Sequence, residues 1–282
     1  MKPTTALEVR RLSPALGAEI LGVDLREALC DAVFEQILQA WHAHQVILLR
    51  DQDLSEDQQW AFGTRFGPLA GGHNRQLEAS REGIAYVSNV RKDGKPIGIL
   101  PDGEMQFHSD QSYREQPSQG SMLHAITVPG AGGNTVFADC YAAYETLPAE
   151  VQRRILGLQA LHVYDYSLNP TQRGGRDVAA DVPRHAQPMV RVHPVTRRKA
   201  LYVSRLMTAH VVGLPDAEGE ALLSMLFDHV EQPRFIYSHA WRKGDVLMWD
   251  NRCVLHARTD FDPRETRLMR RITLKGEPVL AA

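Results

Sequence analysis

The chain has 282 residues and a formal net charge of -2, and its Lys and Arg residues are scattered rather than grouped. The lack of a basic excess argues against a nucleic-acid surface or a polybasic membrane patch. No apolar stretch approaches the length of a membrane span, and the first residues lack the apolar core of a signal peptide. We therefore expect a cytoplasmic protein that acts on a small molecule.

The length also sets an expectation for domain organisation. A chain of this size can bury a sizeable core, and β barrels or sandwiches of this size commonly form one unit, so we expect a single domain over residues 1–282. The three cysteines, Cys30, Cys140 and Cys253, are widely spaced and odd in number, which predicts buried thiols rather than disulfides or a zinc site.

The N-terminal third is predicted to contain two helices and a buried strand. Residues 34–45 place apolar side chains at helical spacing, and the run VILLR at 46–50 is typical of a buried strand. A second helix is expected to begin at Ser55, which stands in capping-box spacing with Gln58. Residues 67–106 are rich in Gly, Asn and charge, which predicts a loop around the short strand IAYVSNV.

The remainder of the chain is richer in strands. The segments SMLHAITV and TVFADC are predicted strands around the turn PGAGGN, and helical pieces follow around Pro148. Residues 165–188 carry Gly, Pro and charge with little periodicity, and so long a loop in a compact domain predicts an active-site lid. The last third is predicted to contain two strands over 189–203, an amphipathic helix over 215–233, and the short strands RFIYSHAW, DVLMWD and CVLHA. Together these elements predict a mainly β fold with peripheral helices, an antiparallel sandwich or barrel.

The stretch FHSDQSY contains the first candidate metal ligands, His108 and Asp110. Side chains two positions apart point to the same side of a strand, so this pair can converge on one ion. His229 and Glu231 have the same spacing, but they end a predicted helix, on which such positions diverge by about 200°. Because non-haem Fe(II) is commonly bound by two His and one carboxylate, a distant third ligand is required.

His256 is the best candidate for that ligand. It lies at the end of a predicted strand pair, and a cluster of Arg residues comes soon after it. Arg267 and Arg271 are expected to share one face of a strand while Arg270 points to the other face. Two guanidiniums aimed inward are costly unless an anion meets them, which predicts a site for a carboxylate or sulfonate. The other histidines lack a patterned partner: we expect structural roles for His42 and His44, core or surface positions for His124, His210 and His239, and surface or lid positions for His162, His185 and His193.

Three segments carry a family resemblance: FHSDQSY, GGNTVFADCYAAYETLP and the C-terminal WRKGDVLMWDNRCVLHARTDFDPRETRLMRRITL. Together they resemble the taurine dioxygenase and 2,4-dichlorophenoxyacetate dioxygenase family of Fe(II)- and 2-oxoglutarate-dependent oxygenases. LGAEILGVDL, HQVILLRDQDLSEDQQWAFGTRFGPL and RKALYV also fit, so the resemblance covers most of the chain. It implies a double-stranded β-helix, the cupin-like jelly-roll of two sheets, which agrees with the predicted strands.

The resemblance also implies a role for each candidate residue. The family's HxD pair and distal His match His108, Asp110 and His256 as metal ligands. Thr135 matches the Thr that hydrogen-bonds the far carboxylate of 2-oxoglutarate, and Arg267 matches its partner Arg. The implied cofactors are Fe(II), 2-oxoglutarate and O2, and the implied reaction hydroxylates a substrate C–H while 2-oxoglutarate is converted to succinate and CO2. Family members are often dimers or tetramers, so we expect a homo-oligomer.

The substrate is expected to be a small organic anion, such as a sulfonate, an aryloxyalkanoate or another carboxylate. Arg271 matches a second family Arg near the substrate anion and the metal-bound end of the cosubstrate. Asn89 and Gln111 lie near positions that could line the pocket. His73 falls close to where the taurine enzyme places a His on the sulfonate, but it is offset by one residue. The tryptophans that flank the final strands, Trp241 and Trp249, are predicted to be core residues.

Two other functional classes remain open from the sequence. One is a jelly-roll metal hydrolase or isomerase that uses the same triad with Zn²⁺ or Mn²⁺. Thr135 and Arg267 argue against it, because such an enzyme needs no clamp for a cosubstrate. The other is a catalytically idle binding protein on the same fold, which would be expected to have lost a metal ligand or the Arg.

Overall fold

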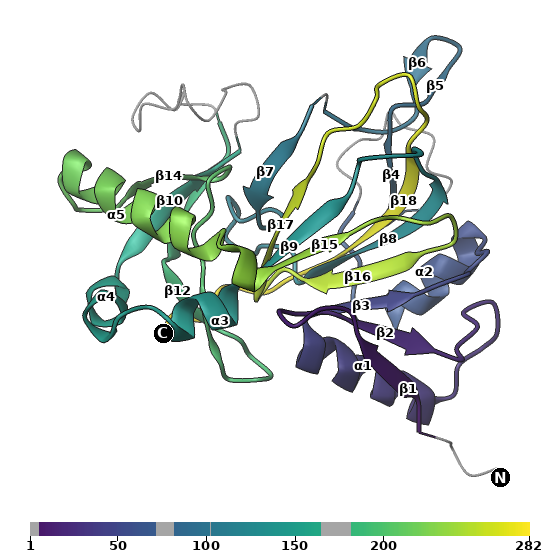
Figure 1. Cartoon of the computed structure of the whole chain (residues 1–282), viewed down its shortest axis with the longest axis horizontal. Coiled ribbons are helices and arrows are strands. Elements are labelled where there is room, and N and C mark those ends of the chain that lie inside the picture. The colour runs from purple at the N-terminus through teal and green to yellow at the C-terminus, as the bar shows by residue number, and fades with distance from the viewer. Residues whose placement is uncertain (1–5, 72–81, 102, 165–181) are drawn as a thin grey trace.

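The computed structural model describes residues 6–71, 82–101, 103–164 and 182–282. Its centre is a pair of facing β-sheets, which occupy the middle and right of Figure 1. The larger sheet has the strand order β1-β2-β3-β16-β8-β18-β4, and the smaller sheet has the order β15-β9-β17-β7. Two packed sheets with helices outside them confirm the predicted mainly β, jelly-roll fold.

Neighbouring strands in both sheets are antiparallel, apart from the parallel pair β2 and β3. The larger sheet consists of β1 (Glu8–Arg11), β2 (Ala18–Leu21), β3 (Val46–Leu49), β16 (Val246–Asp250), β8 (Gly120–Thr127), β18 (Leu268–Leu274) and β4 (Ile84–Ser88). The smaller sheet consists of β15 (Ile236–His239), β9 (Thr135–Asp139), β17 (Val254–Arg258) and β7 (Met105–His108). Between β4 and β7 the chain also forms the short pair β5 (Arg91–Lys92) and β6 (Lys95–Pro96).

The larger sheet buries apolar side chains on both of its faces. Leu247 and Trp249 of β16 belong to the core between the sheets. Val246 and Met248 of the same strand belong to a second core, shared with helices α1 (Asp31–His44) and α2 (Glu56–Thr64). Because both faces are covered, segments such as DVLMWD are continuous apolar runs instead of alternating ones.

The predicted capping box at the start of α2 is confirmed. Ser55 Oγ accepts a hydrogen bond from the Gln58 N–H at 3.2 Å, and Gln58 Oε1 accepts one from the Ser55 N–H at 2.9 Å. These two bonds satisfy backbone donors that a helix N-terminus otherwise leaves without partners.

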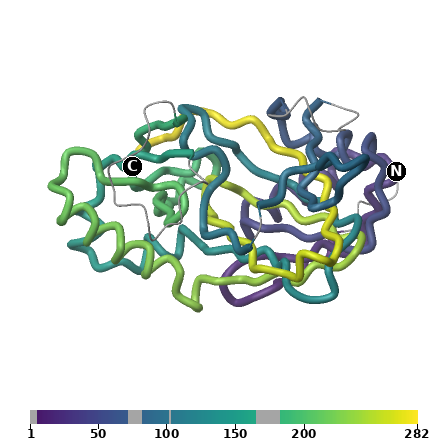
Figure 2. Tube along the Cα trace, turned by 90° about the horizontal axis from the view of Figure 1, so that it is seen from above, coloured from purple at the N-terminus to yellow at the C-terminus, as the bar shows by residue number. Residues whose placement is uncertain are grey.

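The chain between β9 and β15 packs against one end of the two sheets. This part lies on the left of Figures 1 and 2, opposite the N-terminus, and the chain also ends there. It consists of α3 (Cys140–Glu145), α4 (Ala149–Ile155), β10 (Gln159–Val163), β11 (Arg184–Pro188), β12 (Val190–Val192), β13 (Lys199–Leu201), β14 (Thr208–Val211), α5 (Asp216–Val230) and the 3-10 turn η2 (Pro233–Phe235). Leu222 and Leu226 of α5 belong to the same apolar core as Leu247, so the insertion is packed onto the sheets rather than separate from them.

Several expectations about side-chain environment and loops were wrong. Residues 184–188 of the predicted lid form β11, which pairs with β10, while residues 165–181 lie outside the described residues. His162 and His193, predicted at the surface or in the lid, are 1% and 0% exposed, because His162 lies on the middle strand of a sheet and His193 bonds Asp250. Cys30 is exposed rather than buried, since it is the residue that precedes α1.

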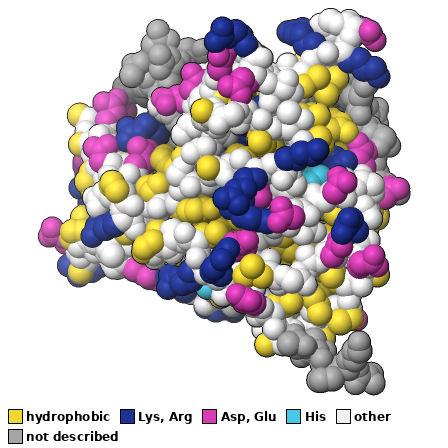
Figure 3. All heavy atoms as spheres, turned by 45° about the vertical axis from the view of Figure 1, so that its right-hand side comes forward, with side chains coloured by type: hydrophobic (Ala, Val, Ile, Leu, Met, Phe, Trp, Pro, Cys, Tyr) yellow, Lys and Arg dark blue, Asp and Glu magenta, His cyan; other side chains and the backbone are white. Residues whose placement is uncertain are grey.

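The surface agrees with the scattered charge of the sequence. On the face shown in Figure 3, Lys and Arg side chains are interspersed with Asp and Glu and with apolar side chains. Across the described part of the chain, no helix combines the length and apolar character needed to cross a bilayer.

The buried His162 predicts a pH-dependent loss of stability. Neither of its ring nitrogens has a hydrogen-bond partner among the described residues, and burial lowers its pKa from 6.5 to about 3. The folded state then binds fewer protons than the unfolded state in this range, so stability falls as the pH falls below 6.5 toward 3. The free energy of unfolding of His162→Phe minus that of wild type should increase by about 2 kcal/mol when the pH is lowered from 7.5 to 5. Urea unfolding at several pH values measures this, and a constant difference between the two proteins would contradict it.

Candidate active site

Two histidines from strands far apart in the sequence lie side by side on the inner face of the smaller sheet. His256 of β17 is directly opposite His108 of β7 in the antiparallel ladder. Their ring centroids are 4.1 Å apart, and both residues are buried. Opposite residues in such a ladder face the same side, so the strand pairing itself brings the two imidazoles together.

Asp110 completes a cluster of three possible metal ligands. Its Oδ1 lies 3.7 Å from His256 Nε2 and 4.0 Å from His108 Nε2. One ligand atom from each of the three residues lies within 4.8 Å of the other two. The sequence predicted that strand alternation would aim His108 and Asp110 together, but β7 ends at His108 and Asp110 lies in the turn that follows.

The protonation states of the three side chains suit a divalent cation. Burial lowers the pKa of both His108 and His256, which keeps the imidazoles neutral. Burial alone would raise the pKa of Asp110, but Arg271 and the two imidazoles hold it below its usual range. Neutral imidazole and ionised carboxylate are the forms that bind metals.

The second oxygen of Asp110 is occupied by hydrogen-bond donors. Asp110 Oδ2 accepts from Ser121 Oγ at 2.6 Å, from Arg271 Nη2 at 2.6 Å and, more weakly, from Asn251 Nδ2 at 3.4 Å. Only Oδ1 is then left to face the histidines. A carboxylate held in this way binds an ion through one oxygen, so coordination positions stay open for small ligands.

The imidazoles and the segment between the ligands are also held by hydrogen bonds. His108 Nδ1 lies 2.9 Å from the Gln106 carbonyl oxygen, which directs Nε2 toward the cluster. Ser109 Oγ donates to the Asn251 carbonyl oxygen at 2.9 Å, and the Trp249 indole N–H donates to Asn251 Oδ1 at 2.9 Å. Asn251 therefore links the turn after β16 to Ser109 and Asp110 of the HxD segment.

A buried cation without an anion in the described residues stands directly before β18, the strand that carries Arg271. Arg267 is 1% exposed, and its Nε and Nη1 have no partner among the residues that the structure describes. Burial and the nearby Arg258 cation lower the pKa of Arg267 to about 9, so it is still charged at neutral pH. A Cβ added to Gly133 would lie 3.5 Å from Arg267 Nε, which places the turn before Thr135 against the guanidinium. A buried guanidinium, with the Thr135 hydroxyl two residues after Gly133, offers donor types that fit a carboxylate.

The backbone around Arg267 is fixed by Asn89. Asn89 Oδ1 accepts from the Arg267 N–H at 2.9 Å, and Asn89 Nδ2 donates to the Glu265 carbonyl at 2.8 Å. Both polar atoms of the amide are thus engaged by the segment that carries Arg267, and the structure shows no contact from Asn89 toward the metal cluster in the described residues.

Strand alternation on β18 separates the two neighbouring arginines as predicted. Arg271 points inward to Asp110. Arg270 points to the other side, where its Nε donates to Gln59 Oε1 at 2.7 Å and its Nη2 lies 3.0 Å from His124 Nδ1. His124 is accordingly a core residue in a polar cluster under α2 and not a ligand.

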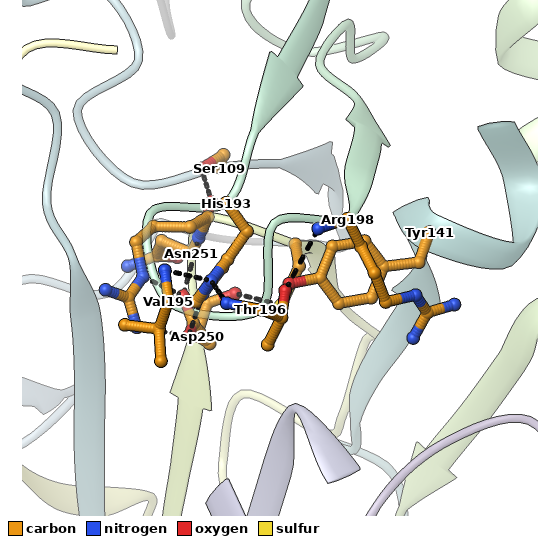
Figure 4. A network of polar contacts seen from close by, with 10 residues as sticks. Ser109, Tyr141, His193, Val195, Thr196, Arg198, Asp250 and Asn251 are labelled. Carbon is orange, nitrogen blue, oxygen red and sulfur yellow. Dashed lines mark hydrogen bonds and ion pairs between the residues drawn. The ribbon is translucent and has the colours of Figure 1, made fainter. Parts of the chain in front are cut away.

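A second group of potential ligands, His193, Asp250 and Cys253, is satisfied without a metal. Figure 4 shows the network around His193 and Asp250. His193 Nε2 lies 3.0 Å from Asp250 Oδ2, and His193 Nδ1 accepts the N–H groups of Val195 and Thr196 at 3.2 and 3.1 Å. Asp250 also receives the Arg252 guanidinium at 2.6 and 2.7 Å. Because both nitrogens of the ring are used, this network anchors the turn between β16 and β17 rather than a cation.

Other predicted site residues are placed as follows. Gln111 adjoins Asp110 and adopts a left-handed backbone conformation with φ 58°. His73 lies outside the described residues. Trp241, predicted to be a core residue, is only half-buried, and its indole N–H donates to Thr135 Oγ1 at 3.0 Å. Sequence reasoning missed Ser121, Asn251 and this contact of Trp241, because none belongs to a local motif with its partner.

Comparison with known proteins identifies the family. A family model described as "Taurine catabolism dioxygenase TauD, TfdA family" matches residues 8–273. The chain belongs to this family. The alpha-ketoglutarate-dependent 2,4-dichlorophenoxyacetate dioxygenase of Cupriavidus pinatubonensis is 37% identical to it over 95% of this chain and 98% of that protein. The (S)-phenoxypropionate/alpha-ketoglutarate-dioxygenase of Sphingobium herbicidovorans is 36% identical over 97% and 96% of the two chains.

Solved structures of proteins with more than 30% identity to this chain share the fold. A taurine dioxygenase from Burkholderia xenovorans superposes with a TM-score of 0.82 at 31% identity, covering 98% of this chain and 93% of that one. AAD-2 in complex with Mn(II) and N-oxalylglycine gives a TM-score of 0.81 at 33% identity, covering 98% and 100%. The predicted class, an Fe(II)- and 2-oxoglutarate-dependent dioxygenase that uses O2, is confirmed, and the hydrolase or isomerase alternative is not supported.

The hydrogen bond from Ser121 to Asp110 should affect metal affinity. In Ser121→Ala the carboxylate loses its shortest neutral donor and can turn away from the histidines, so we expect Mn(II) to bind about tenfold more weakly. Titration of free Mn(II) by electron paramagnetic resonance measures the affinity. Ser118→Ala is the matched control, because Ser118 is also buried but its hydroxyl has no partner in the described residues. Equal affinity in Ser121→Ala and Ser118→Ala would contradict the assignment.

Proposed function

We propose that this dioxygenase hydroxylates a small organic anion of the aryloxyalkanoate type, with His108, Asp110 and His256 as the ligands of Fe(II). The proposal is carried by one observation: two neutral imidazoles and the one carboxylate oxygen of Asp110 that has no hydrogen-bond donor among the described residues converge in a buried site. We also propose that Thr135 and Arg267 hold the far carboxylate of 2-oxoglutarate. The unpartnered guanidinium nitrogens of Arg267 support this role.

Each side chain has a distinct task in the proposed site. The triad fixes the ion from one side, which leaves the other positions for the cosubstrate and dioxygen. When bound, Fe(II) with 2-oxoglutarate and O2 supplies the oxidising chemistry that yields succinate and CO2 and places a hydroxyl on the substrate. Arg267 and Thr135 orient the cosubstrate, and the buried setting limits access of water to the reaction.

The substrate class rests on Arg271 and on the relatives. Arg271 presents a guanidinium beside Asp110, its side chain is 26% exposed, and its Nε has no partner among the described residues. It can therefore meet an anionic group of the substrate or the metal-bound end of the cosubstrate. Relatives named for 2,4-dichlorophenoxyacetate and (S)-phenoxypropionate are 37% and 36% identical, whereas a Saccharomyces cerevisiae relative named for sulfonates is 30% identical. These identities favour an aryloxyalkanoate over a sulfonate.

The remaining expectations stay predictions. Gln111, beside Asp110, is proposed to face the substrate, as is His73. Asn89 is proposed to act on the pocket through the backbone of Arg267. We also propose one catalytic domain over 1–282, since a single apolar core includes residues of both sheets and the insertion. A cytoplasmic location and a homo-oligomer, dimer or tetramer, are likewise predicted.

Cosubstrate binding tests the proposed roles directly. Anaerobic addition of Fe(II) and 2-oxoglutarate to wild type should give the weak visible charge-transfer band of the chelate, and His108→Ala should give none. Arg267→Gln should bind 2-oxoglutarate about a hundredfold more weakly, because a charged partner of its carboxylate is lost. Arg264→Gln is the control, because Arg264 is exposed and pairs only with Asp262 in the described structure. Equal binding by the Arg267 and Arg264 variants would rule out the clamp.

Product formation tests the substrate class. Succinate release should be stimulated more by phenoxyacetate than by taurine, and hardly at all by the neutral analogue 2-phenoxyethanol, which lacks an anion for Arg271. Steady-state assays over a range of each compound give kcat/KM. A preference for taurine, or equal activity with 2-phenoxyethanol, would contradict the aryloxyalkanoate proposal.

A further inference from the structure

The hydroxyl of Thr135 already has one partner, and that partner is a donor. Thr135 is 4% exposed, and its Oγ1 accepts a hydrogen bond from the Trp241 indole N–H at 3.0 Å. An indole N–H can only donate, whereas a hydroxyl has one proton and two acceptor lone pairs. With one lone pair used by Trp241, the Thr135 hydroxyl keeps its single proton free to donate elsewhere.

Trp241 is held in place by a buried polar group at the base of its turn. Trp241 lies between β15 and β16, and the Asp245 carboxylate closes this turn by accepting from the Arg242 N–H at 2.9 Å. The same Asp245 oxygen lies 3.0 Å from His239 Nε2, and Arg50 donates to the carboxylate at 2.9 Å. Asp245 is 1% exposed, so this anchor is shielded from water.

The ring of Trp241 is also fixed from the side. The His239 and Trp241 rings meet edge to face, with centroids 4.6 Å apart and an angle of 88° between their planes. His239 is itself directly opposite Thr135, because β15 pairs with β9 (Figure 1). The Tyr237 hydroxyl lies 2.9 Å from His239 Nδ1, so both ring nitrogens of His239 have partners. The indole N–H is therefore directed at Thr135 by the packing of its ring against His239, and His239 is itself held by hydrogen bonds at both ring nitrogens.

We infer that Trp241 is a positioning residue that makes Thr135 a donor to the far carboxylate of 2-oxoglutarate. This inference rests on the proposed function of Thr135. Without Trp241 the hydroxyl proton can rotate toward any nearby acceptor. The entropy lost when the hydroxyl is ordered would then reduce the binding free energy of 2-oxoglutarate. With Trp241 in place, the proton is directed away from the indole, and the donor is oriented before 2-oxoglutarate binds. Trp241 acts through Thr135 and touches no reacting atom.

Binding of 2-oxoglutarate to the Mn(II)-loaded protein tests the inference without turnover. We expect Trp241→Phe, which keeps an aromatic ring but removes the N–H, to raise the Kd for 2-oxoglutarate about five- to twentyfold by isothermal calorimetry. Thr135→Val should raise it by a similar factor. In the double variant, Trp241→Phe should add less than about twofold, because the hydroxyl that it orients is gone.

An analogue separates positioning from a general structural role. 2-Oxovalerate has the keto acid end of 2-oxoglutarate but no far carboxylate, so Trp241→Phe should leave its Kd unchanged. Trp60→Phe, on α2 beside the other core, is the matched control and should leave both Kd values unchanged. An unchanged Kd for 2-oxoglutarate in Trp241→Phe, or equal losses for both ligands, would overturn the inference. If wild type bound no 2-oxoglutarate, or Thr135→Val bound it as wild type does, the proposed role of Thr135 would fail instead.

Discussion

The register between β7 and β17 is the constraint on which the site depends. It sets His256 opposite His108, and a slip of one residue would turn one imidazole to the other face of the sheet. The apolar core between the sheets opposes such a slip, because Phe137 and Leu255 on the neighbouring positions are fully or almost fully buried. The packing of the jelly-roll and the geometry of the candidate metal site are thus specified by the same pairing.

The charged groups inside the sandwich leave two positions that no side chain of the described residues fills. Asp110 is paired with Arg271, and its remaining oxygen faces two neutral imidazoles. Arg267 has no carboxylate partner in the described residues, although burying an unpaired guanidinium is costly. In the proposed site a metal ion would fill the first position and the far carboxylate of an oxo diacid the second. The unfavourable electrostatic energy of these buried groups thus lies at the residues that are proposed to bind the ligands, which is typical of functional sites.

The sequence predicted much of the site because its main residues stand in short motifs. The HxD pair, His256 and the spacing of Arg267 and Arg271 are visible without a structure, and period-two alternation correctly separated Arg270 from Arg271. The facing sheets and α2 with its capping box also followed from local pattern.

What the sequence did not predict depends on partners that are distant along the chain. Ser121 and Asn251 contact Asp110 only after β8 and β16 pair, and the buried His193 has its carboxylate partner Asp250 57 residues further along the chain. Trp241 was predicted to be a core residue. Its hydrogen bond to Thr135 could not be predicted, because the position of its N–H relative to Thr135 depends on the β9–β15 register. Such contacts leave no periodic signal, since each joins two segments that are individually ordinary.

A crystal structure grown anaerobically with Fe(II) and 2-oxoglutarate tests the central claim most directly. The account predicts one ion bonded to His108 Nε2, Asp110 Oδ1 and His256 Nε2, with the far carboxylate of 2-oxoglutarate on Arg267 and Thr135. An ion held by both oxygens of Asp110, by a fourth protein ligand, or at the His193 and Asp250 cluster would contradict it.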